Sequence, residues 1–150
     1  TYKNGMYQVA IAWKNRESNL PNNYEMACRR LLPGVYSGII DQYVKKGYIR
    51  KVPDAERLPA KAWYLPHFLV LRPDRPTTKT RIVFDASAKS AGVSLNDVIH
   101  QGPKLQRDLF NILIRFRQHP VALISDISEM YLRIEISPED RPYQRFCGVR

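Results

Sequence analysis

The sequence predicts a fold of the α+β class, and three observations lead to it. The chain has 150 residues, which is enough for one domain with a sizeable hydrophobic core. Hydrophobic residues make up 44% of it and charged residues 25%, close to the globular average, so wholesale disorder and collagen-like repeats are excluded. Segments with helical spacing and segments with strand character both occur along the chain.

Two helices are predicted in the N-terminal third, after a first extended segment. Asn22 or Asn23 can cap the first helix, and Pro33 and Gly34 end it. Gly47 stands where the glycine that follows a helix belongs, so it marks the end of the second. The predicted elements are a strand or extended arm over residues 7–13, a helix over 24–32, a helix over 35–44, a strand over 48–52 and a loop over 53–61.

A β-hairpin, a longer helix and several strands are predicted in the rest of the chain. Two apolar runs, 67–71 and 80–85, flank a link rich in turn residues and cations, which is typical of a hairpin with a basic tip. From Pro103 onward, an apolar stripe at helical spacing continues to Phe116. The remaining predicted elements are a buried strand over residues 121–127, a strand over 132–136, a helical turn over 137–140 and a strand from Tyr143 to Val149.

The charge of the chain indicates a polyanionic partner. There are 24 lysines and arginines against 14 aspartates and glutamates, a net charge of +10 at pH 7. Nucleic acid is the first candidate for such a surface, and an anionic membrane surface is the second. No apolar run approaches the roughly 20 residues that cross a bilayer, so no membrane-spanning segment is expected.

The two cysteines, Cys28 and Cys147, lie far apart and belong to no CxxC motif. The three histidines, His67, His100 and His119, are scattered. We therefore expect neither a zinc site nor a disulfide framework, and a reducing, intracellular compartment. His67 and His100 are assigned to packing or surface positions.

One carboxylate is a candidate metal ligand. Asp126 follows an apolar run, so it would stand at the end of a strand that holds it rigidly. Carboxylate oxygens are what a hard cation such as Mg²⁺ needs. The alternative interpretation is structural, because a strand-end aspartate often caps a turn.

Cations gather in and beside the predicted hairpin, at Arg72, Arg75, Lys79 and Arg81. Two strands with a basic tip can close over phosphates as a clamp, or the loop is solvated and its charges only aid solubility. Asp85 follows Arg81 by four residues on the same strand face, and such pairs are mostly structural. A second basic cluster surrounds the end of the second helix, where it can equally complement the helix dipole: Lys45, Lys46, Arg50 and Lys51.

Several strings occur in a definite order and spacing: residues 63–72 (WYLPHFLVLR), 78–88 (TKTRIVFDASA), 94–97 (SLND), 102–103 (GP), 108–110 (DLF) and 126–131 (DISEMY). As a set, they resemble the reverse transcriptase of Pao/BEL-type LTR retrotransposons. The resemblance covers about residues 60–150, and residues 20–27 and 43–52 resemble the segment just before that domain. The set is far more specific than any one string.

The resemblance implies a right-hand polymerase, in which the fingers supply the β-hairpin and the palm supplies the carboxylates. On this interpretation, residues 1–52 form a helical segment that leads into the fingers. Residues 53–118 form the fingers with the basic hairpin and the following helix, and residues 119–150 start a truncated palm. The implied fold is an incomplete α+β unit, a fingers subdomain with the first strands of the palm.

The resemblance also implies a metal site and a reaction. Asp126 matches the first palm aspartate, which holds two Mg²⁺ ions, and the backbone carbonyl of Ile127 would be a further ligand. The implied reaction is attack of a primer 3′-hydroxyl on the α-phosphate of a dNTP. The partners would be template-primer, as RNA or DNA, and dNTP.

Two cations and one aromatic residue receive binding roles from the same resemblance. Arg81 matches the fingers arginine that grips the triphosphate, and Arg72 falls where a second fingers cation usually stands. Tyr131 matches the aromatic residue that stacks under the incoming sugar. The other two cations of the hairpin cluster, Arg75 and Lys79, are expected to contact nucleic acid.

The chain departs from the family in its carboxylates. In the family, further carboxylates come from a Tyr-x-Asp-Asp turn later in the palm, and no such turn occurs in these 150 residues. We therefore expect a fragment, whose partners include the remainder of the polyprotein with the rest of the palm, the thumb and RNase H. Because Asp126 alone cannot hold two cations, the isolated chain is expected not to polymerise.

Two other interpretations stay open. A non-catalytic, basic nucleic-acid-binding module needs only the charge and the hairpin. A degraded retroelement relic would lack partners for its last strand, and its open sheet edge would make it poorly soluble. For the polymerase interpretation, the expected location is intracellular, either cytoplasmic or in retroelement particles, without a membrane partner.

Overall fold

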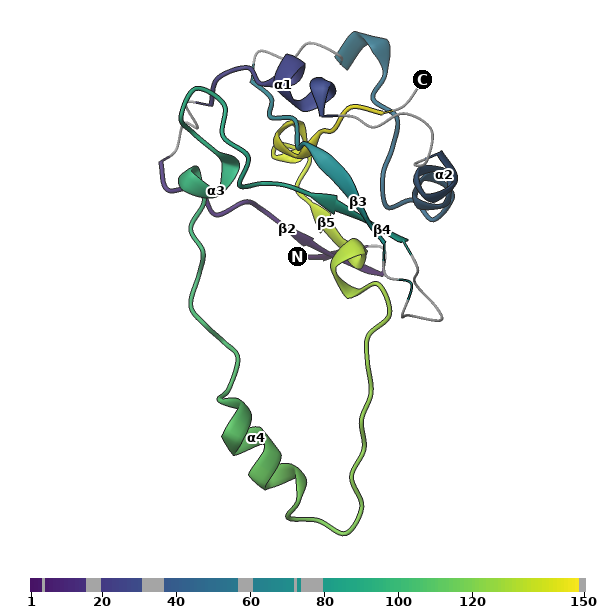
Figure 1. Cartoon of the computed structure of the whole chain (residues 1–150), viewed down its shortest axis with the longest axis vertical. Helices are drawn as coiled ribbons and strands as arrows, with labels where there is room; N and C mark the ends of the chain where they lie inside the picture. Colours follow the sequence, from purple (N-terminus) through teal and green to yellow (C-terminus); the bar gives the residue numbers. More distant parts are fainter. Residues whose placement is uncertain are drawn as a thin grey trace.

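A computed structural model describes residues 1–3, 5–15, 20–30, 37–56, 61–71, 73 and 80–148. Within these ranges the chain is α+β, with short helices and two small sheets (Figure 1). The main body holds both sheets. A long excursion, residues 101–128, leaves the body after α3, carries α4 away from it and returns beside β5 (Figure 1).

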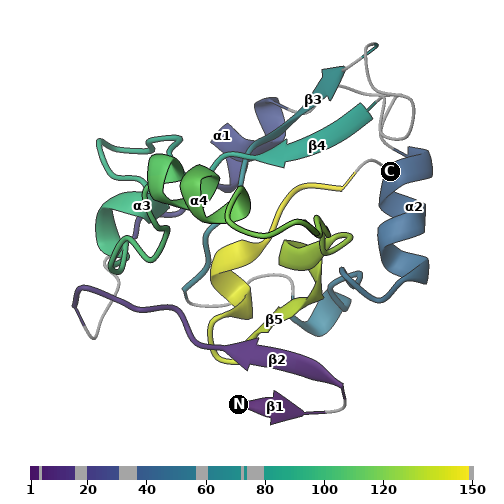
Figure 2. The same cartoon turned by 90° about the horizontal axis from the view of Figure 1, so that it is seen from below.

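The first sheet joins the two ends of the chain. Strands β1 (Tyr2–Lys3) and β2 (Met6–Val9) form an antiparallel pair, and β2 pairs in parallel with β5 (Ile134–Ile136). The order is therefore β1-β2-β5, along one side of the molecule (Figure 2). The predicted extended arm thus begins as a strand, and the predicted strand over 132–136 forms in its second half.

The second sheet is the predicted β-hairpin, which is confirmed. Strands β3 (His67–Leu71) and β4 (Thr80–Phe84) are antiparallel, in a register that sets Leu69 opposite Ile82 and Val70 opposite Arg81. His67 and Ile82 face the core and are buried, whereas Arg81 is exposed on the other face. Most of the basic link between the strands lies outside the described residues.

The described helices begin and end at recognisable signals. They are α1 (Tyr24–Arg29), α2 (Ser37–Lys45), α3 (Leu95–Val98) and α4 (Leu109–Phe116), with 3-10 turns at Asp54–Glu56, Met130–Arg133 and Arg141–Gln144. After α2, Gly47 has φ +73° and its N–H donates to Val44 O at 3.0 Å, while Tyr48 N–H donates to Tyr43 O at 2.9 Å. This Schellman motif confirms the predicted helix end at Gly47.

The helix predicted from Pro103 begins later than expected. Asp108 is its N-cap, because its carboxylate accepts hydrogen bonds from Phe110 N–H at 2.8 Å and Asn111 N–H at 3.4 Å. Residues 103–107 precede that cap and are not helical. The apolar stripe therefore extends beyond the helix that it was taken to define.

The hydrophobic core lies where the hairpin, α3 and the N-terminal arm meet. Trp63 and Leu95 are its most buried large side chains, with Leu65 beside them. Residues packed against this cluster come from several elements: Trp13, Leu20, Phe84, Ala86, Val98, Ile99 and Tyr143. A smaller cluster of Ala27, Tyr64 and Cys147 lies under α1.

Asp140 connects the N-terminal arm to the C-terminal part of the chain. Its carboxylate is buried and accepts hydrogen bonds from Ile11 N–H at 2.8 Å, Trp13 Nε1–H at 2.9 Å and Ser137 Oγ–H at 2.7 Å. Burial pushes the pKa of this carboxyl up, but the three hydrogen bonds together outweigh burial and leave the pKa below its ordinary value.

Three predicted strands are wrong. Residues 48–52 form the turn and irregular chain after α2, because the Schellman motif uses Tyr48. Residues 121–127 are exposed and pair with no strand in the described part of the chain. Of the strand predicted from Tyr143, residues 143–144 belong to a 3-10 turn and only Arg145 forms a bridge, with Tyr64; Val149 lies outside the described residues.

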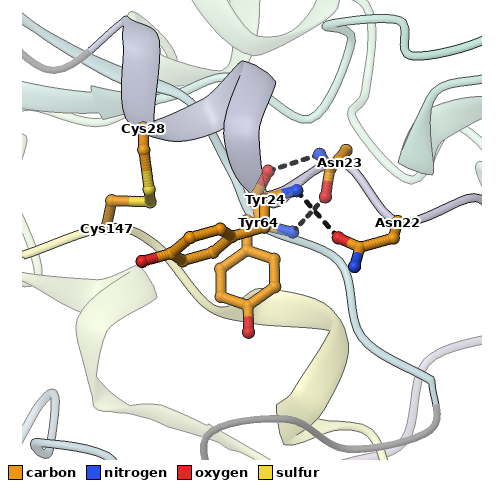
Figure 3. Close-up of a disulfide and its surroundings, with 6 residues drawn as sticks. All are labelled: Asn22, Asn23, Tyr24, Cys28, Tyr64 and Cys147. Atoms are coloured by element: carbon orange, nitrogen blue, oxygen red, sulfur yellow. Dashed lines mark hydrogen bonds between the residues drawn. A yellow bond between two sulfur atoms is a disulfide. The ribbon is translucent and has the colours of Figure 1, made fainter.

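The expectation of no disulfide is also wrong. Cys28 in α1 and Cys147 near the C-terminus form a disulfide across 119 residues of sequence, with their Cα atoms 5.5 Å apart (Figure 3). The inference failed because spacing in the sequence does not reveal which distant segments lie together. His67 is buried and His100 is exposed, as their assignment to packing or surface positions predicted.

Candidate functional site

Asp126 lies in the returning half of the excursion, on irregular, exposed chain. The strand that was expected to hold it does not form, and every residue from 101 to 128 is exposed. No group of three or more His, Cys, Asp or Glu side chains that could hold a metal ion occurs in the described residues. One carboxylate and the neighbouring Ile127 carbonyl do not make the donor set that two Mg²⁺ ions require, so the described residues do not fit the implied metal pair.

Tyr131 lies three residues beyond the excursion, in the 3-10 turn Met130–Arg133 that leads into β5. Its side chain is 80% exposed, and that of Ile127 is 64% exposed. Both are therefore open to a partner. Within the described residues, no hydrogen bond or ring contact joins Tyr131 to Asp126 or to Arg81.

Arg81 is exposed on β4, on the hairpin face that points away from the core. The expected ion pair between Arg81 and Asp85 does not form. Instead, the Asp85 carboxylate accepts hydrogen bonds from both the hydroxyl and the N–H of Ser87, which hold the pKa of this carboxyl below its ordinary value. The other predicted cations of the hairpin, Arg72, Arg75 and Lys79, lie outside the described residues.

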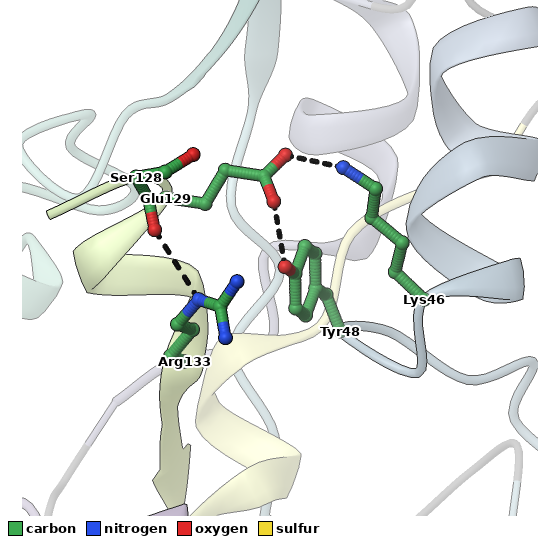
Figure 4. A network of polar contacts seen from close by, with 5 residues as sticks. All are labelled: Lys46, Tyr48, Ser128, Glu129 and Arg133. Atoms are coloured by element: carbon green, nitrogen blue, oxygen red, sulfur yellow. Dashed lines mark hydrogen bonds and ion pairs between the residues drawn. The ribbon is translucent and has the colours of Figure 1, made fainter.

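The turn between Asp126 and Tyr131 is fastened to the end of α2 by Glu129 (Figure 4). Its carboxylate accepts hydrogen bonds from Lys46 Nζ at 2.6 Å and from Tyr48 Oη–H at 2.7 Å. Both partners are more than 80 residues away in the sequence. Glu129 has φ +55°, a left-handed conformation that is uncommon for a residue with a side chain, and these contacts hold it there.

The same contacts change the proton affinities of the three groups. The hydrogen bonds from Lys46 and Tyr48 lower the pKa of Glu129, while the bond to Glu129 raises the pKa of both Lys46 and Tyr48. Glu129 therefore stays ionised and Lys46 protonated over a wide pH range. Arg133 completes the turn, because its Nε–H donates to the Ser128 carbonyl at 3.2 Å.

Comparisons with protein-family models, curated proteins and solved structures find no match to this chain. The described residues also contain no helix with the length and apolar character to cross a membrane.

The contact between Glu129 and Lys46 escaped the sequence analysis. Lys46 was placed in a basic cluster with Lys45, Arg50 and Lys51. In the structure that cluster is partly neutralised, because Lys46 binds Glu129 and Arg50 binds Glu56 at 2.9 Å. Nothing in the local sequence around Glu129 indicates a partner just after α2, since only the tertiary fold brings the two segments together.

The helix α4 carries a second basic surface. A depression of about 510 Å³ on its polar face is lined by Arg107, Asp108, Asn111, Ile112 and Arg115. Arg115 lies on α4, four residues after Asn111 and on the same side of the helix, whereas Arg107 lies in the irregular chain just before the N-cap Asp108. The opposite face is apolar and exposed, with Leu109 and Leu113 on it.

Proposed function

We propose that the chain is part of an RNA-directed DNA polymerase, a reverse transcriptase of a Pao/BEL-type retrotransposon. It would carry the fingers with the basic hairpin and the start of the palm. In the complete protein it would act on template-primer and dNTP. The observation that carries the proposal is the order and spacing of the strings from Trp63 to Tyr131.

The hairpin supports this proposal through its charge and position. β3 and β4 pair in the part of the sequence that the family would use for its fingers hairpin. Arg81 is exposed on β4, so its guanidinium is free to meet a triphosphate, a task for which a planar, permanently charged group is well suited. The net charge of +10 further favours a nucleic-acid partner.

The exposed excursion supports the proposal that further parts of a longer protein complete the active site. Asp126 and the apolar residues around it are exposed; Leu123 is 90% and Ile124 86% exposed. A strand with apolar residues needs a sheet partner to be buried, and the described residues supply none. On the proposal, the remainder of the polyprotein would supply this partner together with the missing carboxylates.

The test is the substitution Asp126→Ala in the protein translated from the whole open reading frame. We expect dNTP incorporation on a primed RNA template to fall by at least a hundredfold, while binding of template-primer changes less than threefold. The matched control is Asp41→Ala, which removes an exposed carboxylate from α2 and should leave incorporation unchanged. Full activity of the Asp126→Ala protein would contradict the proposal.

A non-catalytic nucleic-acid-binding module is the second candidate, and the lone carboxylate at Asp126 favours it. Arg107 and Arg115, which line the depression at α4, and Arg81 on the hairpin would then contact phosphates only. A salt titration measures such contacts, with a slope of about −0.7 to −0.9 per phosphate in log K against log salt. Absence of dNTP incorporation by the complete protein, with binding intact, would select this candidate.

A further inference from the structure

Three segments that are distant in the sequence meet at Tyr64. Asn23, just before α1, binds both backbone groups of Tyr64: its Nδ2 donates to the carbonyl at 2.7 Å, and its Oδ1 accepts from the N–H at 2.8 Å. The neighbouring backbone groups bind Arg145, since Leu65 N–H donates to Arg145 O at 2.7 Å and Arg145 N–H donates to Trp63 O at 3.2 Å. The extended residues 63–65 therefore connect α1 to the C-terminal segment.

The disulfide adds a direct covalent link between these two outer segments. Cys28 belongs to the last turn of α1, and Cys147 lies two residues after Arg145 (Figure 3). The Cα separation of 5.5 Å is within the ordinary range for a disulfide, so the backbones are already in position for the bond. Cys147 is buried against Ala27 and Tyr64, whereas Cys28 is only partly buried.

The C-terminal half of α1 has few other attachments. The helix has six residues, and isolated helices of fewer than about 12–15 residues are marginal in water. Ala27 is its only fully buried side chain. Asn23 fastens the N-terminal end of the helix, and Cys28 fastens the other end. Loss of the disulfide leaves the last turn held by helix hydrogen bonds, the buried Ala27 and an exposed ion pair from Arg29 to Glu25 within the same helix.

We propose that the Cys28–Cys147 bond is a redox-modification site for dithiol reductants, and that its reduction releases the C-terminal half of α1 from the body. A thiolate of the reductant attacks the more accessible sulfur, that of Cys28, and the bond to Cys147 breaks. The Cys147 thiolate leaves and takes up a proton. The second thiol of the reductant then displaces Cys28 as a thiol and closes the reductant into a disulfide, so two electrons and two protons pass to the protein.

This inference does not depend on the polymerase proposal, because it rests on contacts within the main body alone. It also accommodates both the disulfide of the structure and the expectation of a reducing compartment. A protein of a reducing compartment would carry the open dithiol, and the same chain under oxidising conditions would carry the closed bond.

The experiment compares the oxidised 150-residue chain with the same chain after treatment with dithiothreitol. Intact mass and thiol titration should give no free thiol in the oxidised form and two in the reduced form, with a mass gain of about 2 Da for two hydrogens. Amide hydrogen exchange in residues 27–29 should then be at least tenfold faster in the reduced form. The helix α3, which is closed by the Ser94–Asp97 capping box and contains no cysteine, is the internal reference and should not change.

Two variants separate the effect of the bond from the effect of the reductant. Cys28→Ser and Cys147→Ser should each show fast exchange at residues 27–29 without reductant, and dithiothreitol should have no further effect on them. Equal protection of residues 27–29 in the oxidised and reduced wild-type chains would overturn the proposal. So would two free thiols after oxidation, a disulfide formed between two copies, or an oxidised chain without protection at α3.

Discussion

At the residue scale, Asp140 joins the N-terminal arm to the C-terminal part of the chain through its side-chain hydrogen bonds. It is the one buried acidic residue among the described residues, and its three donors come from the N-terminal arm and from its own turn. A buried carboxylate costs free energy unless hydrogen bonds satisfy it, and here they do so well enough to lower its pKa. The N-terminal arm is thus held to the body by hydrogen bonds to an ionised carboxylate.

Replacing Asp140 with Asn tests this role. The amide nitrogen would meet N–H donors, so we expect the free energy of unfolding at pH 7 to fall by about 1–3 kcal/mol. The pKa of Asp140 is lower in the folded state than in the unfolded state, where it is about 3.9. The extra free energy of unfolding that the wild type has over the Asn variant is therefore complete above the unfolded pKa. It should be lost as the pH falls through the folded pKa. Urea unfolding between pH 7 and pH 2.5 measures the difference, and Asp41→Asn, at an exposed position, is the control that should leave the free energy of unfolding at pH 7 within about 0.5 kcal/mol of wild type. A constant difference at every pH would contradict the assignment.

At the scale of elements, two glycines, one in α2 and one just after it, are in opposite situations. Gly38 lies within the helix in ordinary helical conformation, whereas Gly47 follows the helix with φ +73°. In both places there is open space for a methyl group, since nothing lies within 4 Å of the added Cβ. Backbone conformation alone therefore decides the effect of a substitution.

We expect the two alanine substitutions to change stability in opposite directions. Gly47→Ala forces a left-handed alanine and should cost about 1 kcal/mol, which lowers Tm by roughly 2–4 °C for a chain of this size. Gly38→Ala should stabilise by about 0.5–1 kcal/mol, because it restricts the unfolded chain without strain in the helix. Thermal unfolding followed by circular dichroism checks both, and a loss of stability in both variants would refute the argument.

Elements that depend on residues close together in the sequence could be predicted, and contacts between distant segments could not. The hairpin and the end of α2 depend on neighbouring residues, so turn chemistry and Gly47 indicated them. The helix α3 was missed although its capping box, Ser94 and Asp97, is visible in the sequence. The parallel pairing of β2 with β5 and the contact of Glu129 with Lys46 join residues too far apart for any local pattern to reveal.

For the candidate site, too, individual residues could be predicted but the contact between distant segments could not. The sequence offered Asp126, Tyr131 and Arg81 as separate residues, and the structure adds what holds the turn between Asp126 and Tyr131, namely Glu129. The strand expected to carry Asp126 failed for a physical reason. An apolar run forms a strand only against a partner, and the described part of the chain has none for residues 121–127.

At the scale of the whole molecule, the main body and the excursion differ in what their apolar residues contribute. Leu95 is 2% exposed within the core, and Leu123 is 90% exposed on the excursion. In this chain by itself, apolar residues of the excursion have no packing role.

We therefore expect two leucine substitutions to have very different costs. Leu95→Ala should lower the free energy of unfolding by about 2–5 kcal/mol, because it leaves a cavity in the core. Leu123→Ser should change it by less than about 0.5 kcal/mol and should reduce self-association at high concentration. Urea unfolding measures the first effect and analytical ultracentrifugation the second. A cost above 2 kcal/mol for Leu123→Ser would mean that the excursion packs against the body in solution.

The disulfide closes residues 28–147 into a covalent ring, and the excursion is part of this ring. A single backbone cut, for example at a sequence-specific protease site inserted after Gln118, would therefore linearise the ring without separating its halves. Electrophoresis should show one band of full mass until a thiol is added, and two shorter bands afterwards. The cut chain would keep both sheets in one molecule, because the disulfide still joins the two pieces. Reduction would then allow the piece that bears Asp126 to be exchanged for a synthetic peptide.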